Sequence, residues 1–145
     1  MSPHHEYPKA YLYRRIVQAK IFIDAHFREK IDLDDVADEA SFSRFHFIRL
    51  FRQAYGNTPH QYMIQLRMRE AERLLSNADV RIQDICLEVG FESVGTFTTQ
   101  FTKVFGKTPK ARQKEILEKK RLAMEEPLKT IPGCFAQKQF PRTVA

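Results

Sequence analysis

The chain has 145 residues, of which 43% are hydrophobic and 29% charged, as in folded globular proteins and unlike disordered ones. No apolar run approaches the ~20 residues that span a bilayer, residues 1–9 lack the apolar stretch of a secretion signal, and the two cysteines cannot build a disulfide framework. We therefore expect a cytoplasmic protein with no membrane association, in which Cys86 fills core space. The net charge of +6 becomes informative only through its distribution.

The first third of the chain predicts three helices. Residues 9–27 form the first, with inward positions at Ile16, Ala19, Ile23 and Phe27. Asp32 caps a short helix over residues 33–40, and Ser43 caps a longer helix that Gly56 ends. The buried face of this longer helix is predicted at Phe47, Leu50, Phe51, Ala54 and Tyr55. The opposite, exposed face holds Arg44, Phe45, Ile48, Arg49 and Arg52.

A connecting helix and a second set of helices follow. Thr58-Pro59 begins a helix to about residue 75, with apolar positions for both sides at Tyr62, Ile64, Leu66, Ala71, Leu74 and Leu75. A short helix over residues 82–89, a turn at Gly90, and a longer helix from the Ser93 cap to Gly106 come next. The buried face of that helix is predicted at Phe97, Phe101, Val104 and Phe105, and the opposite face at Val94, Gly95, Thr98, Thr99 and Thr102. Thr108-Pro109 begins a last helix to about residue 121.

The chain contains an internal repeat. Five residues recur 50 positions later: Phe47, Phe51, Gly56, Thr58 and Pro59 become Phe97, Phe101, Gly106, Thr108 and Pro109. Upstream, the pattern Leu33, Val36, Ala37, Ala40, Phe42 recurs 49 positions later as Ile82, Ile85, Cys86, Val89, Phe91. The one-residue difference falls in a turn, so the helices stay in register and one structural unit is used twice.

The charges are segregated along the chain. Residues 40–69 contain no Asp or Glu but five arginines: Arg44, Arg49, Arg52, Arg67 and Arg69. Residues 93–114 again lack acids and contain Lys103, Lys107, Lys110, Arg112 and Lys114. Acid-free basic stretches that follow acidic ones favour repeated contact with a polyanion over an ordinary solvated surface.

These elements predict an all-α fold with two helix-turn-helix subdomains joined by a long linker helix. The expected organisation is residues 1–57 for the first unit, 58–76 for the linker, 77–122 for the second unit with the last helix, and 123–145 for a flexible tail. A linker of some 18 residues is roughly 27 Å long, close to the ~34 Å turn of DNA. We therefore expect a monomer to place its two longer helices in adjacent major grooves of double-stranded DNA.

The exposed faces predict how DNA is contacted. Phe45 and Ile48 suit thymine methyl groups, beside arginines that suit guanine. The exposed face of the helix between Ser93 and Gly106 is small and uncharged, so it can approach DNA closely but offers only hydroxyl and methyl groups. We therefore infer that the first unit, with its arginines, discriminates more between DNA sequences. Backbone N–H groups at the Thr58 and Thr108 helix starts can bind phosphate, or these residues serve only as caps. The remaining predicted phosphate contacts are Ser43, Arg44, Arg52, Ser93, Lys103 and Lys107.

The chain resembles the AraC/XylS family of bacterial transcription activators over about residues 16–115. The matching segments are LDDVADEASFSRFHFIRLFRQAYGNTPHQYMIQLRMREAERLL and IQDICLEVGFESVGTFTTQFTKVFGKTP. It is similar to the short members of MarA/SoxS/Rob type, and this resemblance implies base contacts at Phe45, Ile48, Arg49, Gly95, Thr96 and Thr99. It also implies contact with RNA polymerase. Family members commonly have Arg at the position of Thr99 and a polar residue at that of Gly95, two departures in the second unit.

Three alternatives compete with this interpretation. The protein could respond to a small ligand, or be the detached output domain of a larger sensor, although little room is expected for a pocket of ~300 Å³ or more. It could be a nucleoid protein indifferent to sequence. An enzyme is disfavoured, because the five histidines, His46 among them, are dispersed without metal-ligand spacing, phosphate loop or catalytic triad. No cofactor or metal is expected.

Overall fold

A computed structural model describes residues 9–39 and 43–126 of the chain. Within these ranges there are seven α-helices and no strand, so the all-α prediction is confirmed. The helices are α1 (Lys9–His26), α2 (Leu33–Glu39), α3 (Arg44–Tyr55), α4 (Pro59–Leu74), α5 (Ile82–Glu88), α6 (Val94–Phe105) and α7 (Pro109–Glu125). No helix of the described part is both long and apolar enough to cross a membrane.

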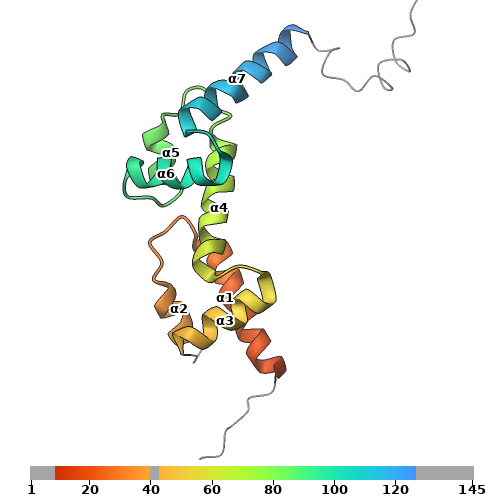
Figure 1. The fold of residues 1–145 in the computed structure, drawn as a ribbon, viewed down its shortest axis with the longest axis vertical. Coiled ribbons are helices and arrows are strands. Elements are labelled where there is room, and N and C mark those ends of the chain that lie inside the picture. Colours follow the sequence, from red (N-terminus) through yellow and green to blue (C-terminus); the bar gives the residue numbers. More distant parts are fainter. Residues whose placement is uncertain (1–8, 40–42, 127–145) are drawn as a thin grey trace, which may run out of the picture.

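Helix α4 forms the axis of an elongated molecule (Figure 1). Helices α1, α2 and α3 gather at its first end, and α5, α6 and α7 lie at its other end. Each group has its own hydrophobic core, and α4 contributes to both: Met63 to the first, and Met68 and Ala71, with Leu75 just after the helix, to the second. The linker is therefore a shared structural element, because unwinding it would open both cores.

The two cores repeat the same arrangement of aromatic side chains. In the first, Phe47 and Phe51 of α3 are buried with their ring centroids 5.9 Å apart. In the second, Phe97 and Phe101 of α6 are buried at a separation of 5.8 Å. The repeat in the sequence is thus a repeat of packing. Cys86 belongs to the second core, as predicted, and burial raises the pKa of its thiol.

The predicted caps of α3 and α6 are confirmed. Ser43 accepts a hydrogen bond from the backbone N–H of His46, and Ser93 accepts one from that of Thr96. Gly56 and Gly106 end the two helices in the left-handed conformation, at φ values of 77° and 73°. A residue with a Cβ resists this conformation, so these two glycines determine where α3 and α6 stop.

Two residues predicted to be buried are exposed instead. Ala54 of α3 is exposed, and Val104 of α6 is 49% exposed. They are 50 positions apart and therefore equivalent in the repeat. Both lie in the last turn of their helix, where no neighbouring helix packs against their side of it. Helical periodicity alone does not reveal how far along a helix such packing extends.

Other differences concern the ends of elements. Helix α7 continues to Glu125, past the predicted end near residue 121 and into the first residues assigned to the tail. The rest of the predicted tail, residues 127–145 with Cys134, lies outside the described residues, as does residue 40 at the end of the second predicted helix.

Candidate nucleic-acid interface

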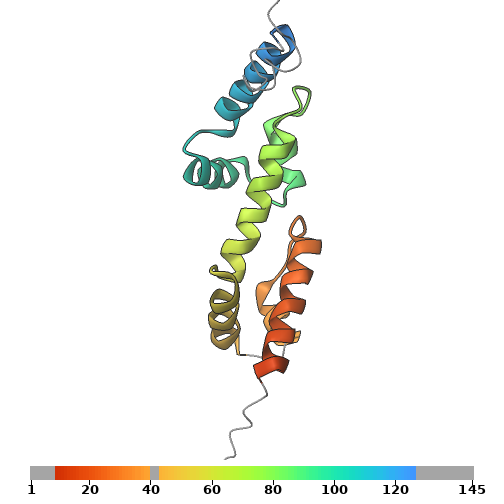
Figure 2. The ribbon, with the colours of Figure 1, turned by 90° about the vertical axis from the view of Figure 1, so that its right-hand side faces the viewer.

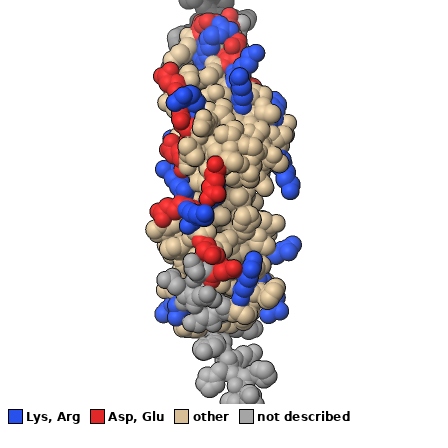
Figure 3. Space-filling view, turned by 90° about the vertical axis from the view of Figure 1, so that its left-hand side faces the viewer, with Lys and Arg blue, Asp and Glu red and all other residues tan. Residues whose placement is uncertain are grey.

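The two helices with acid-free faces, α3 and α6, lie on the same side of the molecule. Figure 2 shows both to the left of the view, whereas α1, α2 and α5 lie to the right. Figure 3 shows this α3–α6 side as its right-hand edge, where lysines and arginines project and the acidic side chains gather mainly toward the opposite edge and the middle. The arrangement presents two helices and positive charge to one extended partner, as a DNA duplex requires.

Helix α3 presents the face that its periodicity predicted, with one correction. Phe45 is 83% exposed, and Arg49 and Arg52 are also exposed. Ile48, predicted to be exposed, is only half-buried because one side of it packs against the first core. Its remaining surface lies beside Arg49, so an apolar contact from this position is restricted to an edge of the face.

Arg44 begins α3 and is tied to the preceding helix. Its Nε lies 3.1 Å from Oδ1 of Asp34 in α2, although its side chain remains 66% exposed. Such an exposed pair contributes at most about 1 kcal/mol. A phosphate that approached Arg44 would therefore compete with the carboxylate of Asp34. Arg52 is for this reason the better predicted phosphate contact of the two.

Helix α6 presents a smaller and chemically different face. Gly95, Thr96 and Thr99 are exposed, and a Cβ added at Gly95 would meet no atom within 4 Å. The Thr99 hydroxyl donates to the carbonyl of Gly95 at 3.0 Å, and the Thr96 hydroxyl accepts from that of Ser93 at 2.9 Å. Because its proton is already used in this hydrogen bond, the Thr99 hydroxyl can serve a binding partner mainly as an acceptor.

The starts of α4 and α7 look alike in sequence but differ in structure. Thr58 forms a capping box in which its own backbone N–H donates to the Gln61 side chain at 3.0 Å. At the start of α7 the third helical position is Ala111, which has no side chain able to accept from Thr108. The Thr108 end therefore offers one more backbone donor to a phosphate than the Thr58 end does.

The second basic stretch contains both exposed and paired cations. Lys103 of α6 is exposed. Lys107 donates to Oε2 of Glu115 at 3.0 Å, and Arg112 bonds to both Glu72 and Glu115. The hydrogen bonds from Lys107 and Arg112 lower the pKa of Glu115 to about 2, so this carboxylate stays charged at neutral pH. Lys107 is thus partly neutralised, and Lys103 is the better predicted phosphate contact.

One of the five arginines in the first basic stretch, Arg67, is buried and not on the surface. Only 8% of this residue is exposed, so it does not belong to the charge available to a polyanion. Its position could have been inferred from the sequence, because Arg67 stands four residues after Met63 and four before Ala71, both buried on α4. A helical stripe with one arginine inside it indicates a buried arginine.

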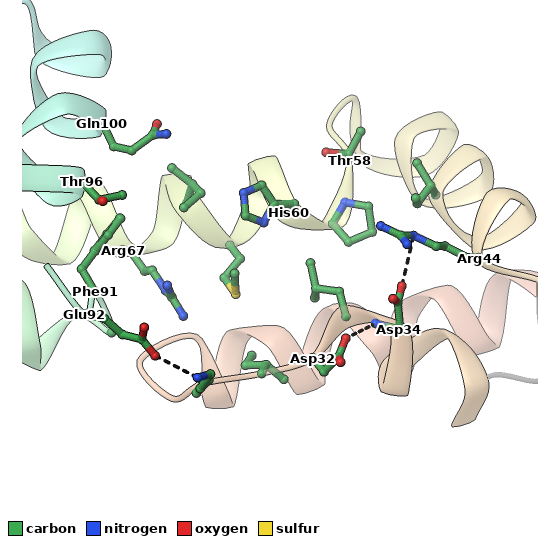
Figure 4. Close-up of a pocket in the computed structure, with 18 of the residues that line it drawn as sticks. Asp32, Asp34, Arg44, Thr58, His60, Arg67, Phe91, Glu92, Thr96 and Gln100 are labelled. Carbon is green, nitrogen blue, oxygen red and sulfur yellow. Dashed lines mark hydrogen bonds and ion pairs between the residues drawn. The ribbon is translucent and has the colours of Figure 1, made fainter.

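A groove of about 790 Å³ lies beside α4, between the two units. Figure 4 shows the Arg44–Asp34 pair at one end and Phe91 and Glu92 at the other, with His60 between them. Its floor includes Met63 and Ile64. The prediction that little room exists for a pocket of ~300 Å³ is therefore wrong, because the units leave space along their shared helix.

The comparisons with known proteins agree with this geometry. A family model described as a helix-turn-helix domain matches residues 36–115. The uncharacterized HTH-type transcriptional regulator YbfP of Bacillus subtilis is 37% identical over 100 residues, which are 68% of this chain and 34% of that protein. The probable transcription factor PqrA of Proteus vulgaris is 38% identical over 81 residues, 56% of this chain and 66% of that protein. This chain thus matches about a third of the length of YbfP.

A solved structure extends the likeness to three dimensions. The DNA-binding domain of AdpA, a global transcriptional factor solved in complex with a target DNA, superposes with a TM-score of 0.65 at 26% identity. The match covers 78% of this chain and 96% of that one. The chain therefore belongs to the AraC family of helix-turn-helix proteins, which are DNA-binding regulators of transcription and not enzymes.

Proposed function

We propose that this protein regulates transcription by binding one asymmetric DNA site as a monomer, with α3 and α6 in successive major grooves. The observation that supports this most directly is the placement of both helices on one side of a single continuous linker helix (Figure 2). A chain that contains two DNA-binding units needs no two-fold partner to span a turn of DNA. The AdpA domain, similar in fold, was solved on its target DNA.

Helices α3 and α6 make different kinds of contact with the DNA bases. Helix α3 discriminates between base pairs through Phe45, Ile48 and Arg49, because a guanidinium can bond guanine in two places while apolar groups meet thymine methyls. Helix α6 approaches the bases closely through Gly95, Thr96 and Thr99. Backbone contacts position the protein without determining sequence. They are proposed at Ser43, Arg44, Arg52, Thr58, Ser93, Lys103, Lys107 and Thr108.

The family resemblance also bears on whether this protein activates or represses transcription. The resemblance supports activation through contact with RNA polymerase, and a regulator of this kind acts on the chromosome in the cytoplasm. Transcription of a reporter in vitro, with purified polymerase and a selected site upstream of a weak promoter, tests this. A rise in transcript supports activation, whereas a fall assigns repression.

Selection of binding sites from random duplexes tests the proposed function directly. We expect an asymmetric consensus of ~20 bp, since two unequal helices contact separate grooves. Selected DNA should bind at least ~10³-fold more tightly than random DNA at physiological salt. A palindromic consensus would contradict the monomeric arrangement. Equal affinity for selected and random duplexes would identify a nucleoid-type protein instead.

Lys103→Ala is expected to weaken binding to every duplex alike. An exposed lysine on α6 that meets a phosphate releases one counterion, so its loss should reduce the slope of log K against log salt by about 0.9. Titrations at several salt concentrations measure this slope. Arg14→Ala is the matched control, because it removes one exposed positive charge from α1, on the other side of the molecule. An unchanged slope for Lys103→Ala would remove this residue from the interface.

A second candidate function is supported by the groove beside α4. Its volume of about 790 Å³ falls in the range that small ligands occupy, and its wall combines apolar side chains with the Arg44–Asp34 pair at its end. A ligand there would touch the start of α3 and so alter DNA binding. Isothermal calorimetry against candidate effectors checks this: a saturable heat that His60→Trp, at an exposed residue lining the groove, abolishes supports a ligand-responsive regulator, and the absence of heat favours control by protein abundance.

A further inference from the structure

Arg67 occupies the boundary between the two cores. It follows Met63 of the first core and precedes Met68 of the second along α4. Its Nε donates to the carbonyl of Phe27 at 2.7 Å, and its Nη2 donates to that of Glu29 at 2.9 Å. Both carbonyls belong to the turn between α1 and α2, so one planar side chain ties the middle of the linker to the first unit.

The same guanidinium touches the second unit. It lies over the ring of Phe91, 5.5 Å from the centroid, and Phe91 forms an edge-to-face pair with Phe97 inside the second core. Gly90 allows this approach, because a Cβ there would lie 2.7 Å from the carbonyl oxygen of Arg28 and 3.0 Å from Cζ of Arg67. The α1–α2 turn, the guanidinium and the α5–α6 turn are therefore in direct contact.

Few other contacts join the two units. The main helix packing of the described chain lies within each unit or on α4. Lys30 and Glu92 form an ion pair at 2.9 Å between the same two turns, but both side chains are at least 80% exposed. An exposed pair restrains geometry weakly. The buried, doubly hydrogen-bonded arginine is the stronger restraint, since its donors form a rigid fork.

We propose that Arg67 is a positioning residue that sets the separation and angle of α3 and α6, and thereby the spacing between half-sites that the protein accepts. The path is short: Phe91 stands two residues before Ser93, the cap of α6, while the α1–α2 turn leads into the helices that hold α3. A change in this contact turns α6 relative to α3. The inference rests on the proposed function, because spacing has meaning only for a protein that binds two half-sites.

The spacing between half-sites that the protein accepts is a sensitive measure of how α3 and α6 are placed relative to each other. Each inserted base pair moves the second half-site by about 3.4 Å and rotates it by about 35°. A protein with a fixed angle between its two helices cannot follow such a rotation with both of them. A protein whose units move independently can, at the cost of weaker binding to the best site.

The test uses the full chain and duplexes in which one base pair is added or removed between the selected half-sites. We expect wild type to bind the selected spacing at least tenfold more tightly than either altered spacing. For Arg67→Met, which keeps a long apolar stem, that preference should fall at least threefold relative to wild type. Arg69→Met, an exposed arginine on the same helix, is the matched control and should keep the wild-type preference.

The outcomes separate this inference from the proposed function. If Arg67→Met lowers affinity for all spacings equally, Arg67 is only structural and the inference is overturned, while the proposed function stands. If wild type itself shows no preference for a spacing, the two-groove function and the inference both fail. If Arg67→Met does not fold, as judged by circular dichroism, Arg67→Lys replaces it, because lysine cannot span both carbonyls.

A measurement without DNA provides an independent check. Spin labels on cysteines introduced at Ala54 and Val104, in a Cys134→Ser background, report the distance between α3 and α6, because both positions are exposed and equivalent in the repeat. Wild type should give a narrow distance distribution, and the Arg67 variant one at least twice as wide. Equal widths would overturn the inference.

Discussion

Phe101→Ala is expected to lower the free energy of unfolding by about 3–5 kcal/mol, which is the usual cost of removing a buried aromatic ring. Phe101 is 0% exposed, and its ring stands 5.8 Å from that of Phe97 and 4.5 Å from that of Phe105. Ile85 and Cys86 of the same core are fully buried as well, so the ring is removed from a closely packed interior. Urea denaturation followed by circular dichroism measures the loss.

The matched control for this experiment is Phe45→Ala. The same ring is removed, but from a side chain that is 83% exposed, so stability should change by less than about 0.5 kcal/mol. The two variants together separate the core role of phenylalanine from its surface role. A loss under about 1 kcal/mol for Phe101→Ala would mean that the second core tolerates a cavity and is packed loosely.

Arg49→Ala is expected to weaken binding to the selected DNA site by about 1–3 kcal/mol, the value of one bidentate contact to a base. Arg49 is exposed on α3 beside Phe45 and Ile48, and α3 lies on the same side of the molecule as α6. Its removal should leave the unfolding transition unchanged, because it contributes nothing to either core. Fluorescence anisotropy titrations at fixed salt, on selected and random duplexes, measure the effect.

Arg52→Ala provides the comparison for Arg49. Arg52 lies on the same exposed face, and its replacement by alanine removes the same positive charge. Arg52 is proposed to contact a phosphate and not a base. Its loss should weaken binding to both duplexes by similar factors, since phosphates are present in every sequence. Equal losses on the two duplexes for Arg49→Ala would move Arg49 from base recognition to backbone contact as well.

Features that depend on neighbours along the chain were predicted correctly. The caps at Ser43 and Ser93 and the stops at Gly56 and Gly106 involve residues within one turn of the helix end, so they appear directly in the sequence. The buried pairs of phenylalanines follow from helical periodicity and from the 50-residue repeat. Such features require no knowledge of how the units pack together.

Features at the edge of a helix face were predicted less well. Periodicity placed Ile48 on the exposed face and Ala54 and Val104 on the buried one, and all three predictions need correction. A residue at such an angle is covered or not according to which helix lies beside it. That neighbour is supplied by a segment elsewhere in the chain, and periodicity contains no information about it.

The sequence by itself determined that this protein contains one helical unit twice, with basic, acid-free stretches and a continuous helix between the units. Tertiary structure alone decided that α3 and α6 lie on the same side, that a groove remains beside α4, and which backbone carbonyls Arg67 binds. Arg67 shows the reason: its hydrogen-bond acceptors at Phe27 and Glu29 are 40 and 38 residues away. Contacts at that distance along the chain arise only when the α1–α2 turn packs against the linker helix.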